Sequence, residues 1–378
     1  MKYKLSDICH YRKGKVDVSL LTDDTYISTE NMIPNRGGIT KAATLPTVDS
    51  TQLYKKGDVL VSNIRPYFKK IWQATCDGGC SNDVLVFQAN EGFDQDYLYY
   101  VLSDDAFFAY AMKTSKGTKM PRGDKHSIMQ YETEVCDLDT QRKIASLLKS
   151  IDSKIELNNA INNNLMQQAK TIFEAEIVNR IELPNGWEKS NLASIADYLN
   201  GLAMQNYRPT DDDQGFPVLK IKELRQGVCD ADSERCSSYI KSNYIVNDGD
   251  VIFSWSGSLL VDFWCGGVCG LNQHLFKVTS TQYAPWFFYS WTNYHLAKFA
   301  AIASAKATTM GHIKRSDIEA AEVIIPSSAD YERIGALIQP LYDLGIALRL
   351  ENRKLAATRD SLLPRLLFGD IDICEAII

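Results

Sequence analysis

Two pairs of cysteines have a spacing that could bind a metal ion. Cys76 and Cys80 form one Cys-x-x-x-Cys segment, and Cys265 and Cys269 form another at an equivalent place later in the chain. Four thiolates can bind zinc, but each pair lies beside glycines at the start of an expected strand, and this spacing is less typical than Cys-x-x-Cys. We therefore expect buried free thiols rather than a metal site.

Other sequence signatures of catalysis are absent. The chain has no Gly-x-x-x-x-Gly-Lys-Ser/Thr loop, no Gly-x-Gly-x-x-Gly, no Asn-Pro-Pro-aromatic tetrad, no Gly-x-Ser-x-Gly and no His-Glu-x-x-His. Its five histidines are scattered, and none has helical ligand spacing with another. We expect a protein that recognises a partner, with no catalytic residue, no metal and no cofactor of its own.

Small, hydroxyl and cationic residues recur in matched loops. The segment 63–67 corresponds to Ser256-Gly257-Ser258, and 116–122 corresponds to 306–312. Such side chains suit contact with phosphates and base edges, although turn chemistry with incidental charge is the alternative. The candidate DNA contacts are Arg12, Lys13, Arg65, Tyr67, Lys69, Lys116, Thr118, Lys119, Arg122, Tyr207, Arg208, Lys222, Ser256, Ser258, Lys306, Thr308, Thr309, His312 and Lys314.

These loops belong to a repeat that spans the whole chain. Lys56-Gly57-Asp58-Val59 returns as Asp248-Gly249-Asp250-Val251, and the copies are offset by about 190 residues. A repeat of this length is a whole domain followed by a long helix, used twice. We expect one module at 1–138, a helix within 139–182, a second module at 183–328, and a second helix with a tail at 329–378. Within the first module, an aromatic helix is expected over 94–112, packed into the core.

Apolar residues at heptad spacing predict the two long helices. The first is expected to begin with Asp139 as its N-cap and to run to about Arg180, roughly 60 Å. In the second, Pro340 predicts a kink or a delayed start, and Pro364 predicts the end. The two stripes favour antiparallel pairing with Asn158 setting the register; the alternative is that each helix packs on its own module.

The expected fold is α+β, with two similar domains at opposite ends of an antiparallel pair of long helices, a coiled coil with pseudo-twofold symmetry. The residues expected at the helix–helix interface are Ile144, Leu148, Ile151, Ile155, Asn158, Leu165, Ile334, Leu337, Leu341, Leu348, Leu355 and Leu362.

The composition is that of an ordinary globular protein. Of the 378 residues, 45% are hydrophobic and 23% charged. The nine cysteines, the polar first residues and the absence of a long apolar run predict a cytoplasmic protein without a membrane partner. The net charge of −6 argues mildly against a general nucleic-acid coat but leaves room for a local basic face.

The sequence resembles the specificity (S) subunit of Type I restriction–modification systems over essentially its whole length. The resemblance lies in the repeated Gly-Asp-Val/Ile segments, the Gly-Thr-x-Met-like loop, the helix motif at 139–158, the Leu-Pro-x-Gly-Trp opening at 183–187 and the ending at 359–371. Val135-Cys136-Asp137-Leu138 departs from the family's proline-rich entry to the helix, which Ile325-Pro326 keeps in the second copy.

The resemblance implies two target-recognition domains, each binding one half of a bipartite double-stranded DNA site. It implies that the helices bind two methyltransferase (M) subunits and that restriction (R) subunits complete the complex. S-adenosylmethionine, ATP and magnesium are then expected only on those partners.

A rod of fixed length between two recognition modules also favours a DNA site with two specified parts and an unspecified gap, because half-sites on one face of B-DNA are about 34 Å apart per turn. Modules with unlike loops would make that site asymmetric. Two alternatives remain: a coiled-coil adaptor whose modules bind protein, and an undetected nuclease or methyltransferase.

Overall fold

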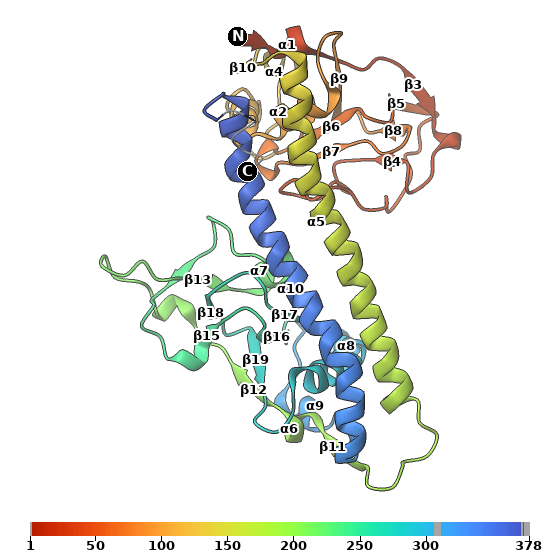
Figure 1. Ribbon diagram of the computed structural model, residues 1–378, viewed down its shortest axis with the longest axis vertical. Coiled ribbons are helices and arrows are strands. Elements are labelled where there is room, and N and C mark those ends of the chain that lie inside the picture. The colour runs from red at the N-terminus through yellow and green to blue at the C-terminus, as the bar shows by residue number, and fades with distance from the viewer. Residues whose placement is uncertain (1, 306–310, 372, 374–378) are drawn as a thin grey trace. The chain divides into compact units, whose positions relative to one another are not determined.

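The computed structural model describes residues 2–305, 311–371 and 373, and it divides into two compact units. Unit 1 comprises Met1–Lys154 and Leu355–Ile378, and unit 2 comprises Ile155–Lys354. Each unit holds one mixed α/β module together with one end of each long helix (Figure 1). The domain boundaries expected from the sequence lie at the ends of the modules and long helices. The boundaries of the compact units lie instead inside the two long helices, after Lys154 and after Lys354.

In the described part of unit 1, two four-stranded sheets and one two-stranded ladder form the module. One sheet has the order β2-β9-β6-β7 and is antiparallel; the other has the order β3-β5-β8-β4, in which β4 and β8 are parallel. The ladder pairs β1 with β10. The strands are β1 (Lys2–Lys4), β2 (Cys9–Tyr11), β3 (Lys15–Asp17), β4 (Tyr26–Ile27), β5 (Ser50–Tyr54), β6 (Val59–Ser62), β7 (Ile71–Gln73), β8 (Gly78–Cys80), β9 (Val84–Ala89) and β10 (Glu132–Glu134).

Unit 2 repeats this plan in its described residues. Its sheets have the orders β12-β19-β16-β17 and β14-β13-β18-β15, with β13 parallel to β18, and β11 pairs with β20. The strands are β11 (Glu188–Asn191), β12 (Asp197–Asn200), β13 (Phe216–Leu219), β14 (Arg235–Cys236), β15 (Ile245–Val246), β16 (Val251–Ser254), β17 (Leu260–Phe263), β18 (Cys269–Leu271), β19 (Leu275–Thr279) and β20 (Glu322–Ile325).

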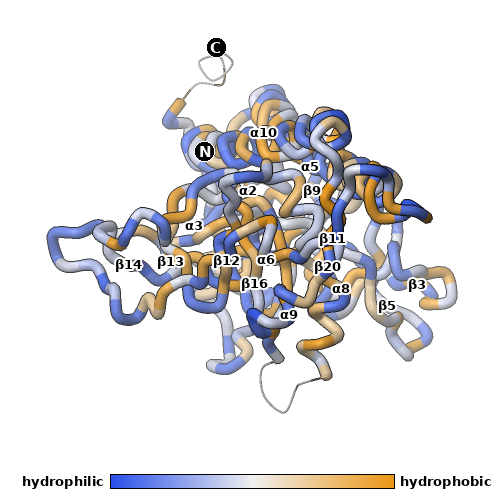
Figure 2. Tube along the Cα trace, turned by 90° about the horizontal axis from the view of Figure 1, so that it is seen from below, coloured by the Kyte–Doolittle hydropathy of each residue, from blue (hydrophilic) through white to orange (hydrophobic). Residues whose placement is uncertain are grey.

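The two copies differ at the edge of the second sheet. In unit 1 the fourth strand, β3, pairs with β5, whereas in unit 2 the fourth strand, β14, pairs with β13 on the other side of the parallel pair. The segment around β14 is largely hydrophilic (Figure 2). The duplicated fold is therefore confirmed, and the copies diverge in polar edge segments rather than in the central strands.

Helices and 3₁₀ turns connect the strands of each module. The expected helix over 94–112 is two helices, because Asp104 ends the first and caps the second by accepting a hydrogen bond from the Ala106 N–H at 2.7 Å. The helices of the modules are α1 (Leu5–Ile8), α2 (Gln95–Ser103), α3 (Asp105–Lys113), α4 (Lys125–Ile128), α6 (Leu192–Ile195), α7 (Ile221–Gln226), α8 (Pro285–Ala305) and α9 (Arg315–Glu319), and the 3₁₀ turns are η1 (Val18–Leu20), η2 (Pro66–Phe68), η4 (Met204–Asn206) and η5 (Ser242–Tyr244).

The long helices are α5 (Leu138–Phe173), extended by a π-helical turn η3 (Glu174–Val178), and α10 (Ser328–Leu367). The N-cap of α5 is Asp137 rather than Asp139, because the Asp137 carboxylate accepts hydrogen bonds from the Asp139 and Thr140 N–H groups. The delayed start expected at Pro340 and the end expected at Pro364 are wrong, since α10 continues through both residues; the kink expected as the other effect of Pro340 stays a prediction. Each proline removes one backbone N–H donor from the helix.

The two long helices run antiparallel in both units, as expected. In unit 1 the Arg359 guanidinium contacts Asp152 at 2.7 Å. In unit 2 Asn158 is fully buried, and its amide N–H₂ donates to Glu351 at 2.7 Å and to Asn352 at 2.8 Å. Asn158 thus has the polar cross-helix partners that a register-setting residue needs.

The ends of the long helices also pack on the modules. The helices therefore pair with each other, which was the expectation, and also pack on their own modules, which was the alternative. Ile144 and Leu148 join the core of unit 1 with the C-terminal end of α10, whereas Ile334 and Ile338 join the core of unit 2 with the C-terminal end of α5. Leu165 is buried, and the remaining expected interface leucines and isoleucines are half-buried except one. Leu337 is 47% exposed, because Ile334, Ile338 and Tyr342 take the inward positions at a spacing of four residues.

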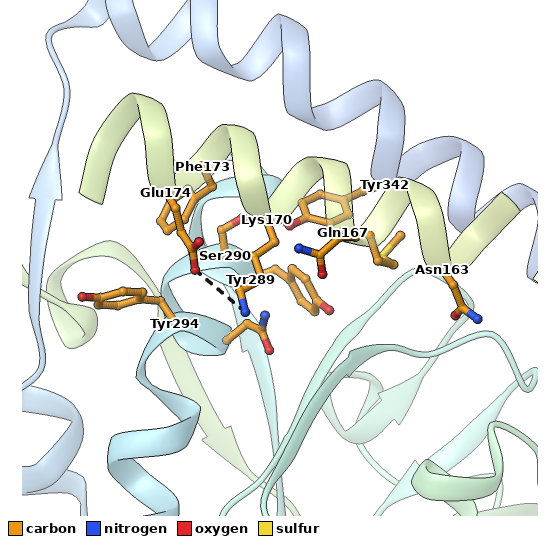
Figure 3. Close-up of a pocket in the computed structure, with 11 residues that line it drawn as sticks. Asn163, Gln167, Lys170, Phe173, Glu174, Tyr289, Ser290, Tyr294 and Tyr342 are labelled. Carbon is orange, nitrogen blue, oxygen red and sulfur yellow. Dashed lines mark hydrogen bonds and ion pairs between the residues drawn. The ribbon is translucent and has the colours of Figure 1, made fainter. Parts of the chain in front are cut away.

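The equivalent positions of the two helix pairs are filled differently. In unit 1 the Tyr100 hydroxyl donates to Asp152 at 2.8 Å. The repeat offset of about 190 residues places Ser290 at the position of Tyr100 and Tyr342 at that of Asp152, and their hydroxyls lie 3.0 Å apart. A cavity of about 190 Å³ lies beside Ser290 and Tyr342 in unit 2, with the Lys170–Glu174 ion pair at its edge (Figure 3).

The four cysteines of the Cys-x-x-x-Cys segments are free thiols. Cys80, Cys265 and Cys269 are buried and Cys76 is half-buried. Burial raises the pKa of Cys80 to about 12 and that of Cys265 to about 11. Within residues 2–305, 311–371 and 373, no group of three or more His, Cys, Asp or Glu side chains is arranged to hold a metal ion.

Candidate nucleic-acid interface

In module 1, the loop after β6 and the loop after α3 are joined by backbone hydrogen bonds. Ile64 forms a β-bridge with Arg122, which also bridges to Lys116, and the Arg65 N–H donates to the Pro121 carbonyl at 2.8 Å. We term residues 63–69 and 116–122 loop pair 1. It brings together seven candidates that are separated in sequence: Arg65, Tyr67, Lys69, Lys116, Thr118, Lys119 and Arg122.

Carboxylates hold several cations of loop pair 1. Arg122 forms an ion pair with Asp83, and Lys116 Nζ lies 3.2 Å from Asp124. Hydrogen bonds from the Ser127 N–H and hydroxyl, together with one from Lys116, lower the pKa of Asp124 to about 2. A guanidinium has five N–H donors, so a single carboxylate orients Arg122 without using all of them. Its side chain remains 55% exposed.

The backbone of loop pair 1 is strained at two cationic residues. Arg65 has φ 52° and Lys69 has φ 49°, a left-handed conformation that costs a residue with a side chain on the order of 1 kcal/mol. Between these residues Tyr67 is 47% exposed. Among the described residues, the Arg65 Nε atom is buried without a hydrogen-bond partner. The backbone hydrogen bond from Arg65 to Pro121 holds the first of these residues, and the bond from the Arg36 N–H to the Lys69 carbonyl at 2.9 Å holds the second.

Module 2 has the same construction at equivalent residues. Ser256 forms a β-bridge with His312, the Gly257 N–H donates to the Gly311 carbonyl at 3.1 Å, and the Ile313 N–H donates to the Trp255 carbonyl at 3.1 Å. We term residues 255–258 and 311–314 loop pair 2. It contains four of the candidates, Ser256, Ser258, His312 and Lys314. Lys306, Thr308 and Thr309 lie outside the described residues.

Loop pair 2 is built around aromatic rings. The Trp255 ring lies 6.0 Å from the rings of both His274 and His312, and its Nε1–H donates to Asn200 at 3.0 Å. Ser256 is buried, with Oγ 3.2 Å from His274 Nδ1, so its role is in the interior of the loop rather than at its surface. Trp255 and His274 were not among the candidates, although Trp255 directly precedes the matched segment.

Arg12 does not belong to either loop pair. It makes a bidentate contact with Asp58 of the repeated Gly-Asp-Val segment, and the Asp58 side chain is only 3% exposed. In unit 2 the matched Asp250 pairs with Lys277 at 2.7 Å. A buried carboxylate needs a partner cation, so both aspartates and Arg12 are scaffold residues. Arg12 thus lies outside both loop pairs, and its contact with DNA stays a prediction.

The remaining candidates lie elsewhere on the modules. Lys13 is exposed next to β2. In module 2 Arg208 pairs with Glu234 at 3.1 Å, and the Tyr207 carbonyl accepts from Ser237 beside β14. Lys222 on α7 pairs with Asp230 at 3.2 Å.

The motif residues that carry the sequence resemblance are structural. The Trp187 Nε1–H of the Leu-Pro-x-Gly-Trp segment donates to Asp330 at 2.9 Å, and the preceding Gly186 has φ 78°. Arg359 of the C-terminal motif meets Asp152 of the helix motif. These contacts join the start of module 2 to α10 and join the two long helices within unit 1.

A duplicated module with matched loop pairs and long antiparallel helices defines a class of two-module recognition proteins. The model of the Type I restriction modification DNA specificity domain matches residues 1–167 and again 184–357. The chain belongs to this family.

Similar proteins agree with that assignment. The chain is 26% identical to the Type I restriction enzyme MjaIX specificity subunit of Methanocaldococcus jannaschii, over 86% of this chain and 80% of that protein. It is 20% identical to the HindI specificity subunit of Haemophilus influenzae, over 98% and 99%. The crystal structure of the Type I restriction–modification S subunit from M. genitalium shares the fold, with a TM-score of 0.60, 13% identity, and coverage of 97% of this chain and 96% of that one.

No helix among the described residues is both long and apolar enough to cross a membrane.

Proposed function

We propose that this chain is the DNA-recognition subunit of a Type I restriction–modification enzyme and that each module binds one half of a bipartite, asymmetric DNA site. The observation that carries the proposal is the pair of equivalent bridges, Ile64–Arg122 and Ser256–His312. The same backbone construction presents exposed cationic side chains in one copy and an aromatic cluster in the other. Equivalent loops with unlike chemistry suit two different half-sites.

The test is footprinting of a duplex that carries the site methylated in the host. Two protected segments separated by an unprotected gap are expected. A single continuous protected segment, or no protection, contradicts the proposal. Binding should also weaken as salt rises, because cations of the loop pairs would displace counterions from phosphates.

We further propose that the long helices bind methyltransferase subunits and that restriction subunits complete the complex. Four apolar side chains of unit 2 support a docking role: Leu157 is 55% exposed, Ile161 37%, Leu337 47% and Leu344 47%. Exposed leucines spaced along a helix are unfavourable in water unless a partner covers them.

Leu157→Gln with Leu344→Gln should weaken co-purification of the methyltransferase subunit, whereas Glu156→Gln on the same exposed helix should not. Unchanged co-purification of the double variant contradicts docking on this face.

In this proposal the chain itself is not an enzyme and holds no cofactor; S-adenosylmethionine, ATP and magnesium act on the partner subunits. The purified chain alone should then neither methylate nor cut DNA. The competing function is a coiled-coil adaptor that binds only protein, which the footprint would distinguish.

A further inference from the structure

We propose that Arg65 and Arg122 of loop pair 1 recognise guanine in the half-site bound by module 1, and that module 2 recognises its half-site without an arginine at the matched positions. The inference rests on the proposed function and specifies its chemistry. It concerns which side chains distinguish one base from another.

The first step is the comparison of matched residues. The repeat places Gly257 at the position of Arg65 and His312 at that of Arg122, since the bridge Ile64–Arg122 corresponds to Ser256–His312. Both guanidinium groups of loop pair 1 therefore have no counterpart in loop pair 2. Differences at equivalent positions of one scaffold are where different sequence preferences can reside.

The second step is the state of the two guanidinium groups. Arg122 is held on one side by Asp83, while its side chain is 55% exposed. Arg65 lies on a left-handed backbone, next to the bridge, and its buried Nε atom has no hydrogen-bond partner among the described residues. Asp83 thus orients Arg122, the Arg65 guanidinium is partly buried with an unpaired Nε, and both side chains retain N–H donors for another acceptor.

The third step is the chemistry of the acceptor. Guanine presents O6 and N7 together in the major groove, and a guanidinium matches this pair with two parallel hydrogen bonds. A phosphate would also accept such bonds, but surface lysines such as Lys119 satisfy a phosphate without fixed geometry. Orientation of Arg122 by a carboxylate and an unpaired, buried Nε at Arg65 add little to phosphate contact and favour a directional partner.

The experiment uses the full chain, co-expressed with its methyltransferase partner, and selection from a random-sequence duplex library followed by sequencing. Arg65→Lys and Arg122→Lys keep the charge and lose the planar pair of donors. Each is expected to lower discrimination for guanine at one position of one half-site by about 10-fold to 100-fold. The other half-site and the salt dependence of binding should stay unchanged.

Arg142→Lys is the matched control, because it makes the same change on an exposed position of α5 in the same unit. His312→Arg is the gain-of-function variant and should add a guanine preference to the other half-site.

The outcomes separate the inference from the proposed function. If the wild-type chain selects a bipartite motif and both lysine variants select the same motif with every guanine preference intact, the inference is overturned and DNA recognition stands. A wild-type motif with no guanine in either half-site also overturns it. If the wild type selects no motif, the proposed function fails as well.

Discussion

The ion pair between Arg359 and Asp152 offers a direct test of how the two long helices are held together in unit 1. Arg359 Nη1 lies 2.7 Å from Asp152 Oδ1, and the side chains are 19% and 22% exposed. The Tyr100 hydroxyl donates to the other carboxylate oxygen at 2.8 Å. The charge of Asp152 raises the pKa of Arg359, although burial opposes this, so the guanidinium stays protonated at any working pH.

Arg359→Ala leaves the carboxylate of Asp152 with one hydroxyl partner and less access to water than a surface group has. Loss of a fully buried pair costs about 3–5 kcal/mol, and an exposed pair is worth about 0–1 kcal/mol. With about one fifth of each side chain exposed, we expect a loss of about 2–3 kcal/mol. The equivalent residue of the other copy is Ala169, so alanine itself is compatible with the helix.

The assay is hydrogen exchange of the full chain, followed in peptides from α2, the N-terminal half of α5 and the C-terminal half of α10. A loss of 2–3 kcal/mol accelerates exchange by about 30-fold to 150-fold in those peptides, because each 1.36 kcal/mol is a factor of ten. Peptides of α8 in unit 2 are the internal reference and should not change.

A double-mutant cycle decides whether the pair itself is responsible. Asp152→Ala combined with Arg359→Ala should cost at least about 1 kcal/mol less than the two single variants added together, since the second removal breaks no further ion pair. Additivity to within about 0.5 kcal/mol would refute the reasoning and leave only lost packing.

Three further results are expected in unit 2. Burial lowers the pKa of His295, which donates to the Glu322 carbonyl at 2.8 Å, so only the unfolded chain takes up a proton near pH 6.5. Stability should therefore fall as pH drops from 7 to 5, and His295→Gln should flatten that slope in urea unfolding at each pH; an unchanged slope contradicts the assignment. Trp187→Phe removes the hydrogen bond to Asp330 and should cost about 1–2 kcal/mol in thermal unfolding; in an Asp330→Ala background, which has no acceptor at this position, the same substitution should cost at least about 0.5 kcal/mol less, and an equal cost in both backgrounds contradicts the assignment. Asn158→Ala strips a buried amide from the helix pair and should cost about 1–3 kcal/mol, seen as faster hydrogen exchange in the middle of α5; unaltered exchange there would mean that the amide is dispensable.

The repeat in the sequence matched each loop of one module with a loop of the other, because equal spacing in two copies implies equal placement in one fold. It did not indicate that the two loops of one module meet: Arg65 and Arg122 are 57 residues apart in the printed numbering, and the backbone bridge between Ile64 and Arg122 is a finding of the structure. The family motifs likewise predicted both long helices. The repeat could not predict which side chains are buried or which residues they contact.

The differences between expectation and structure share that cause. The sequence shows that Arg12 is cationic, but its partner Asp58 lies 46 residues away, and only the folded chain reveals that this carboxylate is buried. Leu337 fits a heptad, yet the helix packs on its module through a spacing of four residues. Asp137 and Asp139 are equally good caps by residue type, and only the structure shows that the Asp137 carboxylate accepts the hydrogen bonds of the first helical N–H groups.

The arrangement separates residues that hold the fold from residues that can set specificity. Asp58, Trp187 and the Asp152–Arg359 pair are buried or half-buried partners whose loss costs about 1–3 kcal/mol, a large part of a domain's stability. Exposed side chains of the loop pairs, such as Lys119 and Arg122, can change with an effect usually within about 0.5 kcal/mol. Under the proposed function, new half-site preferences can therefore arise in one module by substitution in its loops, because the bridges between those loops are made by backbone N–H and carbonyl groups that every residue except proline supplies.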